Sequence, residues 1–365
     1  MKIPFVDLKA QYLSIQNEID TAIRNVINET AFISGGYATR FEADFSKYIG
    51  LPYVIACANG TDSLEILLQA MGIGPGDEVI VPAISWISTS EAVSAIGAKP
   101  VFVDVDEHNL IDLDLIESAI TARTKAIIPV HLYGNPVNMP RVMSLAERFG
   151  LKVLEDCAQS HGAEIQGKLA GTFGHAASFS FYPGKNLGAY GDAGGMATAD
   201  AAIAKKARAI ANHGQEGKHN HIMEGRNSRM DGIQAAVLSV KIPHLPEWTE
   251  KRIKNAALYD QYLDSRIQKP KVNENGKHVY HLYVIRHPKR DALAAYLKEA
   301  GIETSIHYPT PLPLMPCYTE DPKAMASTFS VAAKASSEIL SLPMYAELSE
   351  MEIRYIAEKV NEFNG

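Results

Sequence analysis

The chain has 365 residues, of which 46% are hydrophobic and 21% charged, with a net charge of −7 and a pI near 6.0. This composition is typical of an ordinary soluble protein large enough for two domains. The acidic balance argues against nucleic acid as a main partner, because a phosphate backbone needs a basic surface. No apolar run is long enough to cross a bilayer, so we expect no membrane partner.

Apolar, β-branched segments alternate with helical patterns through the first two thirds of the chain, which predicts a largely parallel α/β sheet. A change in composition near residues 241–246 predicts a large α/β domain over residues 1–245 and a smaller α+β domain over residues 246–365. The predicted strands cover residues 53–57, 78–82, 100–105, 126–130, 152–155 and 279–286, and the predicted C-terminal helices cover residues 247–267, 290–300 and 349–363.

The first motif, residues 57–65, reads Cys-Ala-Asn-Gly-Thr-Asp-Ser-Leu-Glu and combines a strand end, a tight turn and a helix start. Free amides and the positive end of the helix dipole make such a turn a phosphate site, and Gly60 permits close backbone approach. The alternative is a simple helix cap made by Thr61 or Asp62.

In the second motif, an apolar run over residues 151–155 ends on Asp156. A carboxylate at the end of a buried parallel strand can pair with a pyridinium nitrogen and keep it protonated. Gln159, three residues later, could reach the cofactor's phenolic oxygen. The alternative is a helix cap or a buried aspartate satisfied by backbone amides.

The third motif, residues 180–192, places Lys185 among glycines and aromatic residues. Partial burial lowers the pKa of a lysine, and the unprotonated amine can form a Schiff base with the aldehyde of pyridoxal phosphate. Ser180 offers a hydroxyl for the same phosphate. The alternative is a loop lysine that only solvates a turn.

These motifs, in this order, resemble the DegT/DnrJ/StrS family of sugar-nucleotide aminotransferases, which are fold type I pyridoxal-phosphate enzymes. The resemblance runs from residues 4–8 (Pro-Phe-Val-Asp-Leu) through residues 74–79 to residues 306–309, so it covers essentially the whole chain. It implies a mostly parallel seven-stranded sheet and a pyridoxal 5′-phosphate cofactor. The implied roles are the covalent link for Lys185, the ring nitrogen for Asp156, the phenolic oxygen for Gln159, and the phosphate for Gly60, Thr61 and Ser180.

The same resemblance assigns four residues that their own context would not. Trp86 stands where the family stacks an aromatic ring on the cofactor, although a lone tryptophan in an apolar segment is usually core. Asn227 would reach the cofactor phosphate of the neighbouring subunit in a homodimer; by itself it is a turn residue before a helix. His307 and Tyr308 would face the sugar.

The resemblance also implies the reaction, in which an amino group passes from glutamate to a keto sugar carried on dTDP or UDP, in amino-sugar biosynthesis for a polysaccharide or O-antigen. Residues 182–194 resemble members that aminate C3, and the small side chains of residues 188–192 would leave room for that orientation; members acting at C4 more often carry a Thr-Thr pair and a Glu or second Gly there. A 4-keto sugar aminotransferase is therefore the alternative.

Two other classes share the scaffold. Sugar dehydratases replace the lysine with histidine or add an iron-sulfur cluster, and non-catalytic regulators would lose the lysine or the aspartate. Lys185 and Asp156 are both present. The three cysteines, Cys57, Cys157 and Cys317, have no paired spacing, so neither a metal site nor a disulfide is expected. Together with an N-terminus that lacks a signal-peptide core, they predict a cytoplasmic protein.

Overall fold

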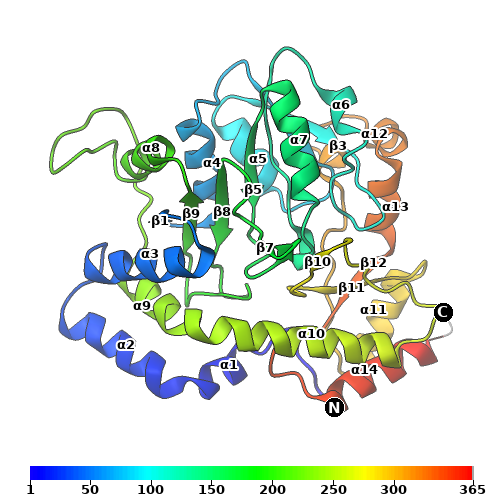
Figure 1. The fold of residues 1–365 in the computed structure, drawn as a ribbon. Coiled ribbons are helices and arrows are strands. Elements are labelled where there is room, and N and C mark those ends of the chain that lie inside the picture. Colours follow the sequence, from blue (N-terminus) through cyan, green and yellow to red (C-terminus); the bar gives the residue numbers. More distant parts are fainter. Residues whose placement is uncertain (364–365) are drawn as a thin grey trace.

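The computed structural model describes residues 1–363, which fold around a seven-stranded sheet flanked by helices (Figure 1). The strand order is β1-β9-β8-β5-β4-β2-β3. The strands are β1 (Tyr53–Cys57), β9 (Gly194–Thr198), β8 (Ala176–Ser180), β5 (Lys152–Asp156), β4 (Thr124–Ile127), β2 (Glu78–Pro82) and β3 (Lys99–Val103). The prediction of a mostly parallel seven-stranded sheet is confirmed.

Strand β9 is antiparallel to both of its neighbours, β1 and β8, and every other neighbouring pair is parallel. The other six strands therefore end at one common edge. In open α/β sheets ligands bind at this edge, because the connections that follow the strands supply backbone amides and side chains there.

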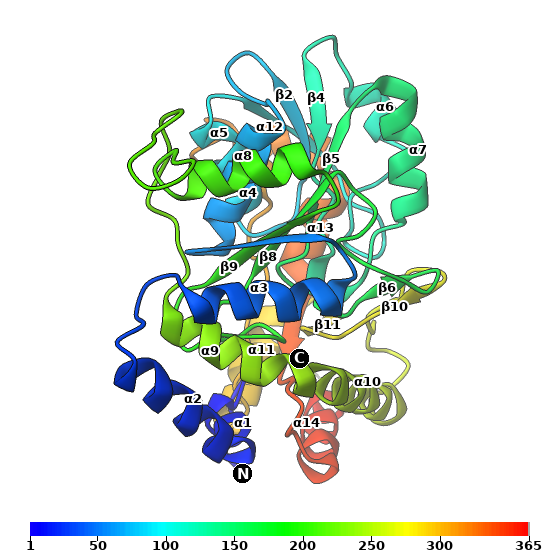
Figure 2. The same ribbon diagram turned by 60° about the vertical axis from the view of Figure 1, so that its left-hand side comes forward.

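Helices cover both faces of the sheet, as Figures 1 and 2 show from two directions. The helices before residue 245 are α1 (Leu8–Ser14), α2 (Gln16–Asn28), α3 (Gly36–Ile49), α4 (Gly60–Ala70), α5 (Ser88–Ala95), α6 (Ile116–Ala119), α7 (Met139–Phe149), α8 (Ala201–Ala211) and α9 (Gly232–Lys241). The later elements are α10 (Leu245–Tyr262), β11 (Tyr283–Arg286), α11 (Arg290–Glu299), α12 (Pro322–Thr328), α13 (Ser330–Glu338), β12 (Ile339–Leu342) and α14 (Glu350–Glu362). None of these helices is long and apolar enough to span a membrane.

Among the clusters of buried residues, the largest lies on the sheet, and another lies around α10, α11 and α14. Ile3 belongs to the second cluster and bridges to Ile302, so the N-terminal segment packs with the C-terminal part of the chain. Conversely, Phe329 and Ala332 of the C-terminal part pack against the cluster on the sheet. The division of the chain at residue 245 stays a prediction.

Several element ends differ from those predicted; β4, for example, covers Thr124–Ile127 and not residues 126–130, and the two largest differences lie in the C-terminal part of the chain. Helix α10 ends at Tyr262, because Leu263 adopts an extended backbone (φ −75°, ψ 135°), and not at residue 267. The strand predicted over residues 279–286 is ordered as β11 only from Tyr283, where antiparallel pairing with β12 begins. Upstream, the Val279 amide donates a hydrogen bond to the Gly134 carbonyl at 3.0 Å.

Candidate active site

The predicted site residues meet at the common edge of the sheet. Gly60 and Thr61 begin the helix after β1, Trp86 precedes the helix after β2, and Asp156 and Ser180 are the last residues of β5 and β8. Residues far apart in the sequence are neighbours here: Gly60 and Ser180, 120 positions apart, lie side by side. The sheet topology therefore brings the three sequence motifs together.

The turn before α4 forms a cradle of backbone amides. Asn59 caps the helix, since its Oδ1 accepts a hydrogen bond from the Asp62 amide at 2.8 Å, so the cap is not made by Thr61 or Asp62. A Cβ atom added to Gly60 would lie 2.6 Å from the Cβ of Ser180. Only glycine allows this approach, which puts the Ser180 hydroxyl beside the free amides of the helix start, as a phosphate requires.

Asp156 is a buried carboxylate, 5% exposed. Its Oδ2 accepts a hydrogen bond from Thr89 Oγ1 at 2.9 Å and its Oδ1 accepts one from the Ala158 amide at 3.1 Å. Burial raises the pKa of Asp156, and these hydrogen bonds and the charge of Lys185 lower it. The carboxylate is thus oriented at the strand end where a ring nitrogen would need it.

Lys185 lies in the connection between β8 and β9, in a turn closed by a hydrogen bond from its own amide to the Tyr182 carbonyl at 2.8 Å. Its side chain is half-buried. Burial lowers the pKa of Lys185 to about 8, and the charge of Asp156 opposes this shift. Within residues 1–363 the ammonium group has no hydrogen-bond or ion-pair partner, so the amine is both readily deprotonated and free to react.

Gln159 connects the strand end to the predicted sugar side. Its Oε1 accepts a hydrogen bond from the Tyr133 amide at 2.6 Å, and its Nε2 donates to the Tyr308 hydroxyl at 3.1 Å. The ring of Tyr308 lies 5.7 Å from that of Trp86, centroid to centroid. Trp86 is 58% exposed, so it is not a core residue and its ring is available to a ligand.

Three histidines interact electrostatically with the amine of Lys185, and of these only His307 was a predicted site residue. Burial and the charge of Lys185 lower the pKa of His307 to about 4 and that of His161 to about 3, and they also lower the pKa of His281. These imidazoles are therefore neutral at physiological pH. His161 and His281 have no sequence signal, because their approach to Lys185 depends on the folded chain.

Asn227 is exposed and, among the described residues, its side chain makes no hydrogen bond. It borders a depression of about 490 Å³ beside the phosphate cradle. The neighbouring Ser228 hydroxyl accepts a hydrogen bond from the Ala58 amide at 3.2 Å. The depression is lined by Ile33, Ala58, Gly191, Asp192, Asn227, Arg229, Asp231 and Gln234.

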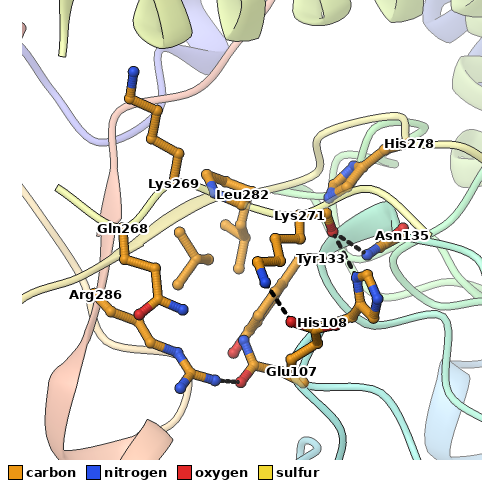
Figure 3. A pocket seen from close by; sticks show the side chains of 13 residues that line it. Glu107, His108, Tyr133, Asn135, Gln268, Lys269, Lys271, His278, Leu282 and Arg286 are labelled. Atoms are coloured by element: carbon orange, nitrogen blue, oxygen red, sulfur yellow. Dashed lines mark hydrogen bonds and ion pairs between the residues drawn. The ribbon is translucent and has the colours of Figure 1, made fainter. Parts of the chain in front are cut away.

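A second cavity lies behind Tyr133 (Figure 3). Its volume is about 20 Å³, enough for roughly one water molecule. Lys271 is paired with Glu107, and the Lys271 carbonyl accepts a hydrogen bond from Asn135 at 2.9 Å (Figure 3). The cavity is too small and too fully bonded for a substrate.

His131, Glu155 and Cys157 form a buried cluster whose side chains could in principle hold a metal ion. His131 Nδ1 accepts a hydrogen bond from the Val137 amide at 3.0 Å, so Nε2 carries the proton that goes to Glu155. Glu155 also accepts hydrogen bonds from the amides of residues 171, 173 and 174. Burial holds the pKa of Cys157 well above its ordinary value. With its ligand atoms occupied or protonated, the cluster is structural.

Comparison with known proteins shows the family of the chain. The model of the DegT/DnrJ/EryC1/StrS aminotransferase family matches residues 13–361. This chain belongs to that family. Among curated members, it is 46% identical to a "Pleiotropic regulatory protein" of Geobacillus stearothermophilus, over 100% of this chain and 99% of the relative.

Two further members of the family have enzyme names. The chain is 43% identical to the UDP-N-acetyl-3-dehydro-alpha-D-glucosamine 3-aminotransferase of Acidithiobacillus ferrooxidans, over 97% of this chain and 96% of the relative. It is 42% identical to the dTDP-3-amino-3,6-dideoxy-alpha-D-galactopyranose transaminase of Aneurinibacillus thermoaerophilus, over 99% of both chains.

The fold is shared with a solved member of the family, DesV of S. venezuelae in complex with a ketimine intermediate. The TM-score is 0.96 and the identity 40%, over 99% of this chain and 98% of that chain. The predicted family, fold type, aminotransferase activity and pyridoxal-phosphate cofactor are confirmed. The roles of the individual residues stay predictions.

Proposed function

We propose that this aminotransferase moves an amino group from glutamate to C3 of a keto sugar linked to dTDP or UDP. The observation that carries the proposal is the unpartnered Lys185 amine, whose pKa burial lowers to about 8, beside the buried carboxylate of Asp156. The 3-amino products and substrates in the names of the two enzyme relatives support C3.

The residues of the site divide the work. Pyridoxal phosphate, when bound, supplies an aldehyde and an electron-withdrawing ring. Gly60, Thr61 and Ser180 would hold its phosphate, and Asp156 would keep a proton on its ring nitrogen. Lys185 would anchor it covalently and, once free, take a proton from one carbon and return it to another.

The remaining site residues would bind and orient. Trp86 would lie against the cofactor ring, and Gln159 would donate to its phenolic oxygen. His307, which is neutral because burial lowers its pKa to about 4, and Tyr308 would face the sugar. A neutral imidazole can accept or donate a hydrogen bond without adding charge.

Support for C3 comes from the relatives, because the small residues after Lys185 have another explanation. A Cβ atom on Gly188 would collide with the carbonyl of Pro183, and one on Gly191 would lie 2.8 Å from Gln234 Nε2. Ala189 is fully buried. These residues are small because the loop packs tightly on its own chain.

A panel of UDP- and dTDP-linked 3-keto and 4-keto sugars tests the proposal, with glutamate as donor and mass spectrometry of the products. We expect 3-amino sugars. Exclusive formation of 4-amino sugars would overturn C3, and no amination of any sugar would overturn the substrate class. A regulator, as the name of the Geobacillus relative suggests for that protein, would bind a sugar nucleotide without turnover; the intact Lys185 and Asp156 argue against it here.

We also propose a cytoplasmic homodimer in which Asn227 reaches the phosphate of the partner's cofactor. Asn227→Asp would place a negative charge there, and Lys185→Ala removes the amine, so each variant homodimer would be nearly inactive. A mixed dimer would have one site with both changes and one with neither, so activity would return. Inactive samples that demonstrably contain mixed dimers would show that each site is built within one chain.

A further inference from the structure

Two hydrogen-bonded series of hydroxyl groups pass through the first turn of α5, one by way of Thr89 and the other by way of Ser88. In one, Ser85 Oγ lies 2.7 Å from Thr89 Oγ1, which lies 2.9 Å from Asp156 Oδ2. In the other, Thr61 Oγ1 lies 2.7 Å from Ser88 Oγ, which donates to Glu91 at 2.9 Å. Adjacent residues of one helix thus contact opposite ends of the predicted cofactor site.

The direction of the first series follows from counting protons. An ionised carboxylate only accepts hydrogen bonds, so the Thr89 hydroxyl must donate its single hydrogen to Asp156. Ser85 must then donate to Thr89. A hydroxyl that itself receives a hydrogen bond is a stronger donor, which makes Ser85 a support for the Thr89 bond.

This series is closed to water. Ser85 is 3% exposed, Thr89 1% and Asp156 5%. A buried carboxylate without donors would take up a proton, because the low-polarity interior disfavours its charge. In the described part of the chain, Thr89 and the Ala158 amide are the two groups that donate to the Asp156 carboxylate. Thr89 therefore contributes to both the charge and the orientation of the carboxylate.

We propose that Thr89, supported by Ser85, is a positioning residue that keeps Asp156 ionised and aimed at the cofactor's ring nitrogen. The proposal rests on the proposed role of Asp156. The neighbouring Ser88 acts on the phosphate side instead, because it accepts the hydrogen bond of Thr61.

The test uses Thr89→Val, which keeps the shape and removes the hydroxyl, in enzyme reconstituted with pyridoxal phosphate carrying ¹⁵N in the ring. We expect the ¹⁵N signal to move toward the unprotonated form. The single-turnover rate with glutamate should fall about ten- to a hundredfold, the range for losing a hydrogen bond to a charged group. Thr89→Ser should restore both. Ser85→Ala should shift the signal in the same direction by less.

Ser88→Ala is the matched control, since it removes a hydroxyl from the same turn of α5. It should weaken pyridoxal-phosphate binding and leave the ¹⁵N signal in place. An unprotonated ring nitrogen in the parent enzyme would refute the role of Asp156 itself. A protonated parent with unchanged signals in Thr89→Val and Ser85→Ala would overturn only the role of Thr89. If Thr89→Val does not fold, the Ser85→Ala signal decides.

Discussion

Two lysines, Lys185 and Lys241, have pKa values that burial lowers to the same extent, but their amino groups differ in their hydrogen-bond partners. Burial lowers the pKa of each to about 8. Lys241 donates to Gln11 Oε1 at 2.9 Å and to the Gly188 carbonyl at 2.8 Å, and its Nζ lies 4.4 Å from the centre of the Tyr190 ring. In the described part of the chain Lys185 has no such partner.

The comparison shows that a lowered pKa does not by itself identify a reactive amine. A nucleophile also needs an unengaged nitrogen and a place for the electrophile. Lys241 has neither, because it is 1% exposed and bonded to two oxygens. It donates to the carbonyl of Gly188, three residues after Lys185, so Lys241 supports the loop that carries the proposed catalytic lysine.

The largest expected effect is that of Lys185→Ala, which should abolish transamination while the protein stays folded. The variant loses both the covalent anchor and the proton carrier. Product formation by mass spectrometry and thermal unfolding measure the two properties. Turnover at the parent rate would mean that another amine, with Lys241 the first to examine, does the chemistry.

Asp156→Asn should lower the rate by orders of magnitude and retain the cofactor, because a neutral amide cannot stabilise a protonated ring nitrogen. It should also lower the pKa of Lys185 further in cofactor-free protein, since the charge of Asp156 now raises that pKa. The pH dependence of amine labelling at Lys185 measures this shift. Parent activity would remove Asp156 from the proposed role.

Lys241→Met should destabilise the fold by about 1–3 kcal/mol, because two buried acceptors lose their donor while a costly buried charge is removed. The rate should fall only severalfold, since Lys185 remains. Urea unfolding and the turnover rate measure these effects. Lys205→Met is the control, because it breaks an exposed ion pair with Glu216 and should change the stability by less than about 1 kcal/mol. If Lys241→Met lowered turnover as much as Lys185→Ala does, the assignment of a structural role to Lys241 would be wrong.

The last prediction concerns the pH dependence of stability. The folded-state pKa of Lys241 is about 8 and its ordinary value 10.5, and burial is the cause, with Glu347 opposing it. Between these values the unfolded chain binds more protons, so the contribution of Lys241 to stability rises with pH. Relative to Lys241→Met, the parent should gain up to about 3 kcal/mol between pH 7.5 and pH 10.5. The titration of Lys185 cancels in this difference, and parallel unfolding curves would refute the shift.

The sequence predicted what local patterns encode. Residues 78–82 form a strand with the predicted bounds, and Asp156 ends β5 as its apolar run indicated. The structural role of Lys241 could not be predicted from the sequence, because its two hydrogen-bond partners lie 230 and 53 residues away along the chain. Thr89 was missed for the same reason, since its bond to Asp156 spans 67 residues. Contacts that depend on the folded chain leave no local pattern.

The connection between β8 and β9 is anchored by residues other than Lys185. Gly188 and Tyr190 bond to α9, and Asn186 donates to the Val279 carbonyl at 3.1 Å. One substitution at position 185 would therefore end the chemistry and leave the loop, the phosphate cradle and the sheet intact. Divergence from a catalyst into a binding protein needs no new fold on this scaffold, only the loss of one amine.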